Sequence, residues 1–274
     1  MKILEYYSQL FKHSSFNNNF ISIFINAFIL FFLLLLNIKY KFKINTTFVD
    51  FYLTFYPLKK KMGGRGIFIF REKIEPLMQH GLGLIKKNFI CIDAGANQGI
   101  FSIPFAKIAG EHGKVIAIEP MKYAQEIIKN NARINNLSNI YVYNGVLSNQ
   151  NGLATLDYTD GIGSSSILRD HGKKNLLEVN SNTMDNLYNE YSLNRIDFIK
   201  LDVEGAELLA LKGAKNILEK FKPIICLECG VFEFDNINNF LKKFGYSSYI
   251  YSFSGNLIKT NKIFKDMSNV FFKI

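Results

Sequence analysis

The chain has 274 residues, of which 48% are hydrophobic and 20% are charged, so it can bury a core and is not expected to be disordered. The net charge is +10, and residues 1–80 carry +7 of it, with 11 Lys or Arg against 4 acids. The positive charge therefore belongs mainly to the N-terminal part. A basic channel for nucleic acid across the rest of the chain is not indicated, and no nucleic-acid partner is expected.

An apolar run, FISIFINAFILFFLLLL, extends from Phe20 to Leu36, with only Ser22 and Asn26 polar. A helix of this length is about 25 Å long, at the short end for a bilayer span. The run is apolar on all sides, and no signal-peptide cleavage site follows it. The sequence favours a hydrophobic N-terminal segment, residues 1–38, that inserts into a membrane as a single-pass anchor. A docking or dimerisation helix is the alternative.

Lysines follow this run directly, at Lys39, Lys41 and Lys43. Positive flanks stay on the cytoplasmic side, so the C-terminal domain is expected to be cytoplasmic. Alternatively, these lysines belong to a solvated linker and say nothing about membrane topology. Residues 39–80 are predicted to form a basic linker and lead-in, with MGGRG at 62–66 as a flexible turn.

From residue 88 onward, short apolar runs alternate with helical patterns. The predicted strands are 89–93, 113–120, 139–144, 196–202, 222–230, 248–253 and 269–274, with a hairpin arm at 151–158. The predicted helices are 100–109, 123–135, 206–221 and 234–244. This alternation predicts an α/β domain over 81–274 with a mostly parallel, Rossmann-like sheet. Ligands of such sheets bind beyond the carboxyl ends of the strands.

The first of these strands ends in CIDAGANQG, an acid followed by a glycine-spaced loop. A dinucleotide fold has G-x-G-x-x-G here, whereas this loop reads D-x-G-x-x-x-G from Asp93 to Gly99. A carboxylate suits a ligand with an ammonium and a sulfonium, such as S-adenosylmethionine, and repels a pyrophosphate. Gly95 and Gly99 let the backbone approach such a ligand. The second strand ends in Glu119, which is suited to hold ribose hydroxyls.

The three cysteines predict no disulfide framework. Cys91 lies in an apolar strand, where a free cysteine packs as a small hydrophobe. Cys226 and Cys229 have a CxxC spacing, but no second pair completes a zinc site, and positions i and i+3 of a strand face opposite ways. Core packing is favoured, and metal or redox use is the alternative.

The stretches FICIDAGANQGIFS, GKVIAIEP, VNSNTMDNL, IDFIKLDVEGAELLALKGA and KPIICLE resemble FkbM-family methyltransferases in order and spacing. The resemblance covers about residues 66–274. It implies a class I methyltransferase fold, with a seven-stranded sheet and one antiparallel strand near its C-terminal edge. It also implies S-adenosylmethionine as donor and O-methylation of a hydroxyl on a sugar, a glycan or another small molecule.

The resemblance also assigns roles to individual residues. The cofactor-binding residues it implies follow the first three strands of the domain: Asp93, Gly95, Ala96, Asn97, Gly99, Glu119, Asn144, Gly145 and Val146. Asp202, at the end of the next strand, would face the point where donor and acceptor meet. Glu204 follows it, and helix capping is the structural alternative for that acid.

An alcohol acceptor profits from a general base within hydrogen-bond reach. Asp202 is the first candidate, Glu204 the second and His171 the third. His171 lies in a polar loop, 161–175, that would close over the acceptor or simply stay on the surface. No metal ligand is assigned, although Asp202 and Glu228 offer oxygen ligands for a divalent ion.

Two other functions stay open at this stage. A nucleic-acid methyltransferase that modifies amino groups usually carries [DN]-P-P-[YFW] after this strand to hold the flipped base. This chain has Asp202-Val203-Glu204-Gly205 there. The other alternative is a membrane-tethered module that binds S-adenosylmethionine without catalysis.

Overall fold

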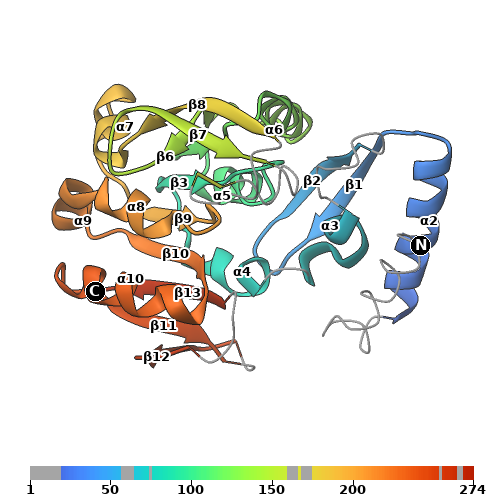
Figure 1. Ribbon diagram of the computed structural model, residues 1–274. Coiled ribbons are helices and arrows are strands. Elements are labelled where there is room, and N and C mark those ends of the chain that lie inside the picture. Colours follow the sequence, from blue (N-terminus) through green and yellow to red (C-terminus); the bar gives the residue numbers. More distant parts are fainter. Residues whose placement is uncertain are drawn as a thin grey trace.

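The computed structural model describes residues 20–56, 65–73, 76–158, 166–167, 175–252, 255–263 and 268–274. Its centre is an eight-stranded sheet in the order β12-β11-β13-β10-β9-β3-β4-β5 (Figure 1). These strands are β3 (Ile90–Ala94), β4 (Lys114–Ile118), β5 (Ile140–Tyr143), β9 (Phe198–Leu201), β10 (Ile224–Cys229), β11 (Ser247–Tyr251), β12 (Leu257–Thr260) and β13 (Ser268–Lys273).

The expected class of fold is confirmed, but the sheet is larger and more mixed than expected. β5, β4, β3, β9 and β10 are parallel neighbours. β13 runs antiparallel between β10 and β11, as expected for one strand near this edge. β12 then pairs antiparallel with β11 and adds an eighth strand that the sequence did not predict.

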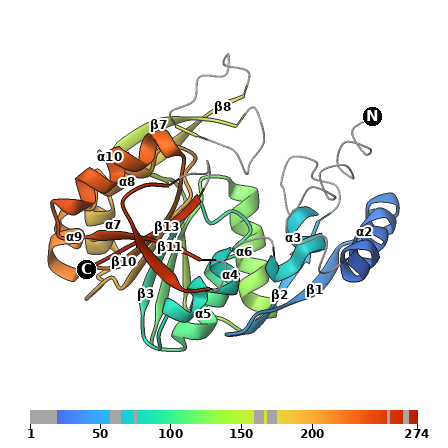
Figure 2. The same ribbon diagram turned by 90° about the horizontal axis from the view of Figure 1, so that it is seen from below.

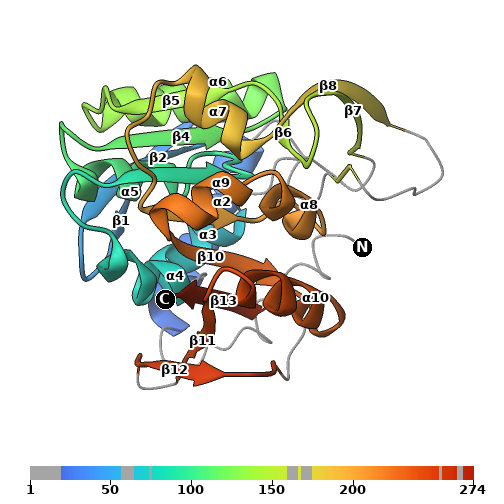
Figure 3. The same ribbon diagram turned by 90° about the vertical axis from the view of Figure 1, so that its left-hand side faces the viewer.

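Helices cover both faces of this sheet. α5 (Ser102–Ala109) and α6 (Lys122–Ile134) pack on one face, and α7 (Met184–Glu190), α8 (Glu207–Lys212), α9 (Lys215–Phe221) and α10 (Val231–Lys242) cover the other (Figures 2 and 3). A hydrophobic core lies on each face of the sheet. The three cysteines are buried in these two cores and form no disulfide bond. Cys226 packs on the α5 side and Cys229 on the α10 side, which confirms that the CxxC spacing places its thiols on opposite faces.

Residues predicted as one helix, 206–221, form two. α8 ends at Lys212 with Gly213 as its C-cap, and α9 starts at Lys215. A Cβ at Gly213 would lie 2.1 Å from the Ser148 carbonyl oxygen, so the close approach of another loop requires glycine there. A separate three-stranded sheet contains β6 (Val146–Leu147), β8 (Leu176–Asn182) and β7 (Gly152–Asp157). β7 and β8 form an antiparallel pair, which confirms the predicted hairpin arm.

The segment expected to be a basic linker instead contains regular structure. β1 (Tyr40–Asn45) and β2 (Asp50–Phe55) form an antiparallel hairpin. α3 (Arg65–Phe70), η1 (Arg71–Lys73), α4 (Pro76–Gln79) and η2 (Gly81–Leu84) lead into β3. Residues 62–64 of the expected turn lie outside the described ranges, and Arg65 and Gly66 begin α3.

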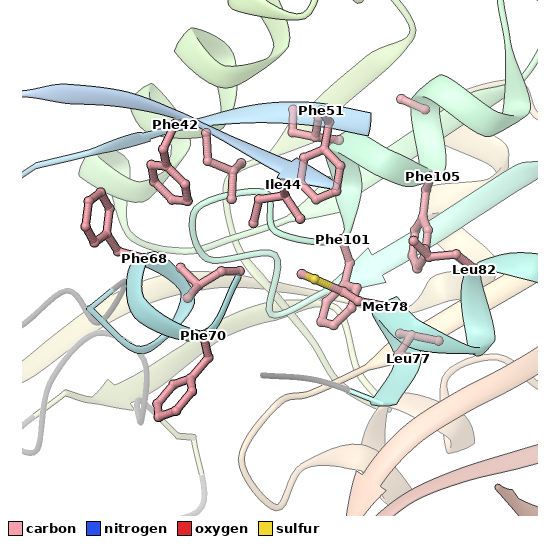
Figure 4. Close-up of a cluster of buried hydrophobic side chains, with 14 of the residues drawn as sticks. Phe42, Ile44, Phe51, Phe68, Phe70, Leu77, Met78, Leu82, Phe101 and Phe105 are labelled. Atoms are coloured by element: carbon pink, nitrogen blue, oxygen red, sulfur yellow. The ribbon is translucent and has the colours of Figure 1, made fainter. Parts of the chain in front are cut away.

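Alternating side chains explain why the hairpin packs on the main domain. Phe42 and Ile44 of β1 and Phe51 of β2 are buried, and Figure 4 shows them beside Phe68 of α3. The same cluster continues through the η2 region to Phe105 of α5. The hairpin and the main domain therefore share one hydrophobic core.

Two asparagines bind the outer edge of β2: Asn131 of α6 and Asn135, the C-cap of that helix. Asn135 accepts from the backbone N–H of Tyr52 at 2.8 Å and donates to the Tyr52 carbonyl at 2.7 Å. Asn131 accepts from the N–H of Thr54 at 3.0 Å and donates to the carbonyl of Gln98 at 2.9 Å. These bonds satisfy backbone groups that an edge strand leaves unpaired.

The N-terminal hydrophobic segment contains a 16-residue helix, α2 (Phe20–Leu35). One stripe of it, with Ile23, Ala27, Leu30 and Leu33, is buried, and the helix packs on α3. Among the residues that the structure describes, no helix combines the length and the apolarity needed to cross a bilayer. The predicted single-pass span is therefore not supported.

Candidate active site

A pocket opens at the carboxyl ends of the parallel strands, as the fold predicts. Its walls come from the loops after β3, β4, β5 and β9. Its cavity volume is about 240 Å³. A single water needs only about 10–15 Å³ of such space, so the pocket accommodates an organic ligand.

The glycine loop after β3 forms one wall through Gly95, Ala96 and Asn97. Gly95 has φ +74°, and a Cβ there would lie 1.9 Å from the Asp202 carbonyl oxygen. The loop therefore approaches the end of β9 more closely than any side chain would allow. Asn97 also has a left-handed backbone, with φ +47°, which asparagine tolerates better than most residues.

Glu119, at the end of β4, lines the pocket although its side chain is almost fully buried. Its carboxylate accepts the backbone N–H of Asn97 at 2.8 Å and of Met121 at 2.9 Å, one on each oxygen. Burial raises the pKa of Glu119 to about 7, and these two hydrogen bonds only partly oppose the shift. Each oxygen keeps a lone pair for a further donor.

Asp93 lies beneath the pocket and is not among the residues that line it. Its side chain is fully buried, accepts the Ser102 hydroxyl at 2.5 Å, and lies 3.8 Å from the Lys200 ammonium. Burial raises the pKa of Asp93, and attraction by Lys200 only partly offsets that effect. The carboxylate predicted to face a ligand therefore has internal partners in this structure.

Lys200 is a charged pocket residue that the sequence analysis missed. It is buried in β9, opposite Asp93 of β3, and its ammonium lies 3.1 Å from the Asp202 carboxylate. Burial alone lowers its pKa, but attraction by Asp202 and Asp93 outweighs burial and raises it. A lysine inside the apolar strand FIKL was the available signal, because a buried lysine needs a partner.

Asp202 follows β9 and lines the pocket, with its side chain 36% exposed. Glu204 also lines the pocket, and its carbonyl accepts the Ser166 hydroxyl at 2.7 Å. The neighbouring Ile167 belongs to the pocket wall as well. Ser166 and Ile167 of the 161–175 loop therefore lie at the pocket, while His171 falls outside the described residues.

Two further predicted residues lie near the pocket without lining it. Gly99 is buried behind the loop, with φ +78°. Asn144 is exposed and accepts the Gln125 amide at 2.7 Å, whereas the next residues, Gly145 and Val146, line the pocket. A wall that was not predicted comes from Gly66 and Ile67 of α3.

The pocket residues fit S-adenosylmethionine, on two observations. The side-chain oxygen of Asn97 is buried and has no hydrogen-bond partner among the described residues, a costly state that a ligand donor relieves. The Glu119 carboxylate, with its remaining lone pairs, suits two adjacent hydroxyls of a ribose. Within the described ranges, no group of three or more His, Cys, Asp or Glu side chains is arranged to hold a metal ion.

Comparisons with known proteins agree with this geometry. The family model described as the methyltransferase FkbM domain matches residues 93–248, more than half of the chain. Methyltransferase sdnD of Sordaria araneosa is 29% identical over 160 residues, which cover 47% of this chain and 61% of that relative. The match therefore spans less than two thirds of that protein's length.

Two solved structures show a more distant likeness. A methyltransferase FkbM from Methylobacillus flagellatus KT covers 77% of this chain and 53% of its own, at 16% identity and a TM-score of 0.49. The match to the putative methyltransferase SMU.1697c of Streptococcus mutans, in complex with SAH, covers 70% of this chain and 92% of that chain, at 15% identity and a TM-score of 0.41. On the family match over residues 93–248, this chain belongs to the methyltransferase FkbM family.

Proposed function

We propose that this methyltransferase transfers a methyl group from S-adenosylmethionine to a hydroxyl of a sugar, a glycan or another small molecule. The observation that carries the proposal is the meeting of Glu119, the glycine loop and Asp202 around one pocket. The donor supplies an activated methyl on a sulfonium. Since the methyl is already activated, positioning accounts for much of the acceleration.

Donor binding falls to the loops after β3, β4 and β5. Glu119 accepts the ribose hydroxyls, and the Asn97 side chain offers its unpartnered oxygen to a ligand donor. Gly145 and Val146 line the pocket, and the proposal assigns their backbone to the adenine. Asp93 acts indirectly, because its carboxylate with Ser102 and Lys200 fixes the strand ends beneath the loop.

Asp202 is the general base of the proposed reaction. One oxygen of its carboxylate accepts the Lys200 ammonium at 3.1 Å, which fixes the orientation of the side chain. The second oxygen then takes the proton of the acceptor hydroxyl. Glu204 is the next candidate for that role, and His171 the third. Ser166, a described residue of the 161–175 loop, donates its hydroxyl to the Glu204 carbonyl and so lies beside the second candidate base.

The domain is proposed to work in the cytoplasm, where S-adenosylmethionine is made. The test of function is transfer from methyl-labelled donor by the full chain to a panel of free sugars, glycans and lipid-linked sugars. A product that carries the label on oxygen and resists mild base supports a methyl ether, because mild base hydrolyses a methyl ester. Label on nitrogen or carbon contradicts hydroxyl methylation.

Asp202→Asn tests the base. Turnover is expected to fall by about 10²-fold or more, the range of a lost general base, with donor affinity largely kept. Asp235→Asn makes the same change at an exposed position of α10 and is expected to be neutral. Unchanged turnover in Asp202→Asn would leave Asp202 a structural residue and transfer the role to Glu204 or His171.

A further inference from the structure

α2 lies at the edge of the molecule, away from the central sheet (Figure 1), and its exposed side has an apolar stripe. The stripe contains Ile21, Phe24, Ile25, Phe28, Phe32 and Leu35, whose exposed fractions range from 42% to 74%. Their spacing of three, four and seven residues places them on one side of a helix. Contiguous exposed apolar surface of this kind marks a binding site.

The opposite side of α2 is fixed to the protein, so the outer stripe cannot turn inward. Its buried stripe packs on α3, and the Asn26 side chain donates to the Ile69 carbonyl at 2.9 Å and accepts from Arg71 at 3.3 Å. Turning the helix would remove this packing and both hydrogen bonds. α2 is therefore a helix with one face docked and one face presented outward.

The charges beside α2 indicate what covers the stripe. α2 has no charged residue, and the exposed Lys39 and Lys41 follow it. Both ammoniums lie over tyrosine rings, and these neutral rings do not cancel the positive charge. The acid of the hairpin, Asp50, is paired with Lys43 at 2.6 Å. An anionic lipid surface offers an apolar layer for the stripe and negative headgroups for the lysines, whereas a second copy offers the same positive charge.

We propose that α2 lies in the plane of an anionic membrane surface, with its outer stripe at the boundary between headgroups and acyl chains. This mode differs from a transmembrane anchor, because only one face of the helix leaves water. It uses no residue of the methyl-transfer site and does not rest on the proposed reaction.

The sequence has no tryptophan, so one introduced indole reports on this face alone. Phe28→Trp in the full chain is expected to shift its emission to shorter wavelength on adding vesicles of phosphatidylcholine and phosphatidylglycerol. Lipids brominated in the acyl chain are expected to quench it. Phe232→Trp, on α10 and 88% exposed, is the matched control and is expected to show neither effect.

Vesicle flotation of otherwise native chains gives the second measurement. Phe24→Ser with Phe28→Ser is expected to lower lipid partitioning by about tenfold or more, because two large apolar side chains are lost from the contact. Phe232→Ser is the control. Lys39→Gln with Lys41→Gln is expected to weaken binding to anionic vesicles several-fold and to leave binding to pure phosphatidylcholine unchanged.

Three results would overturn the proposal. The first is an indole at position 28 whose emission ignores vesicles. The second is an emission that shifts with protein concentration in the absence of lipid, which would assign the stripe to a second copy. The third is an indole already shielded in dilute lipid-free protein, which would mean that the chain covers its own stripe. Donor binding equal to wild type verifies that each variant is folded.

Discussion

The strongest single test of the site is Glu119→Gln. The wild-type carboxylate accepts one backbone N–H on each oxygen, from Asn97 and from Met121. A glutamine places an NH₂ group against one of these N–H groups, so one acceptor is lost and two donors meet. The substitution therefore weakens both the turn that shapes the glycine loop and the proposed contact with the ribose.

The size of the effect follows from the burial of Glu119. Losing one buried hydrogen-bonding partner costs about 1–3 kcal/mol, or roughly 5- to 150-fold in the dissociation constant for S-adenosylmethionine. A second effect depends on pH. The pKa in the free protein is about 7 and the ordinary value is 4.5, so protonation removes the competent carboxylate as pH falls through 7. Affinity at about pH 5 is therefore up to ~100-fold weaker than above pH 8, and binding near pH 7 releases protons.

Isothermal titration calorimetry of the full chain measures both quantities. Titrations over about pH 5 to pH 8 give the affinity profile, and two buffers of different ionisation enthalpy give the number of protons released. Glu119→Gln is expected to be weaker at high pH and nearly independent of pH. Glu126→Gln, which removes an exposed carboxylate from α6, is expected to follow the wild type.

A wild-type dissociation constant that is the same at both ends of this pH range would refute the reasoning. It would mean either that Glu119 is ionised throughout this pH range or that its carboxylate takes no part in holding the ligand. Equal affinity of wild type and Glu119→Gln at high pH would remove the ribose assignment altogether.

Two further predictions concern what supports the site. Lys200→Met leaves the buried Asp93 carboxylate without its cation and is expected to lower the free energy of unfolding by about 3–5 kcal/mol in urea denaturation, whereas the exposed Lys215→Met is neutral. An unchanged denaturation midpoint in Lys200→Met would show that Asp93 does not depend on that cation. Asn135→Leu removes both hydrogen bonds to Tyr52, a loss that costs about 1–3 kcal/mol of local stability. The rate of amide hydrogen exchange in β2 is therefore expected to rise by tenfold or more. Exchange equal to wild type would show that packing alone holds the hairpin.

The strands and loops around the pocket follow from local sequence. An apolar run before Asp93 and another before Glu119 predict β3 and β4, and parallel strands place both acids at one edge of the sheet. The family resemblance predicts Asp202 as a further site residue, and Asp202 lines the pocket. These features depend on residues close together in the chain, which is why they were predictable.

Other features depend on contacts that the sequence does not display. The break between α8 and α9 comes from the approach of the Ser148 backbone to Gly213. Whether Asp93 faces a ligand or the interior depends on Lys200, 107 residues later. The hairpin at 40–55 is different, because Phe42 and Ile44, then Phe51 and Leu53, alternate as strand residues do. That signal was present and was outweighed by the lysines between them.

The N-terminal elements contact the loops of the family domain that form the pocket. Asn131 holds the amide of Thr54 in β2 with one end and the carbonyl of Gln98 in the glycine loop with the other. Ile67 of α3 meanwhile forms part of the pocket wall. The proposed attachment at α2 and the proposed binding of the donor therefore meet at one shared wall. If attachment changes the arrangement of this wall, it changes the affinity for the donor, and by thermodynamic reciprocity the donor changes the affinity for the attached surface by the same factor.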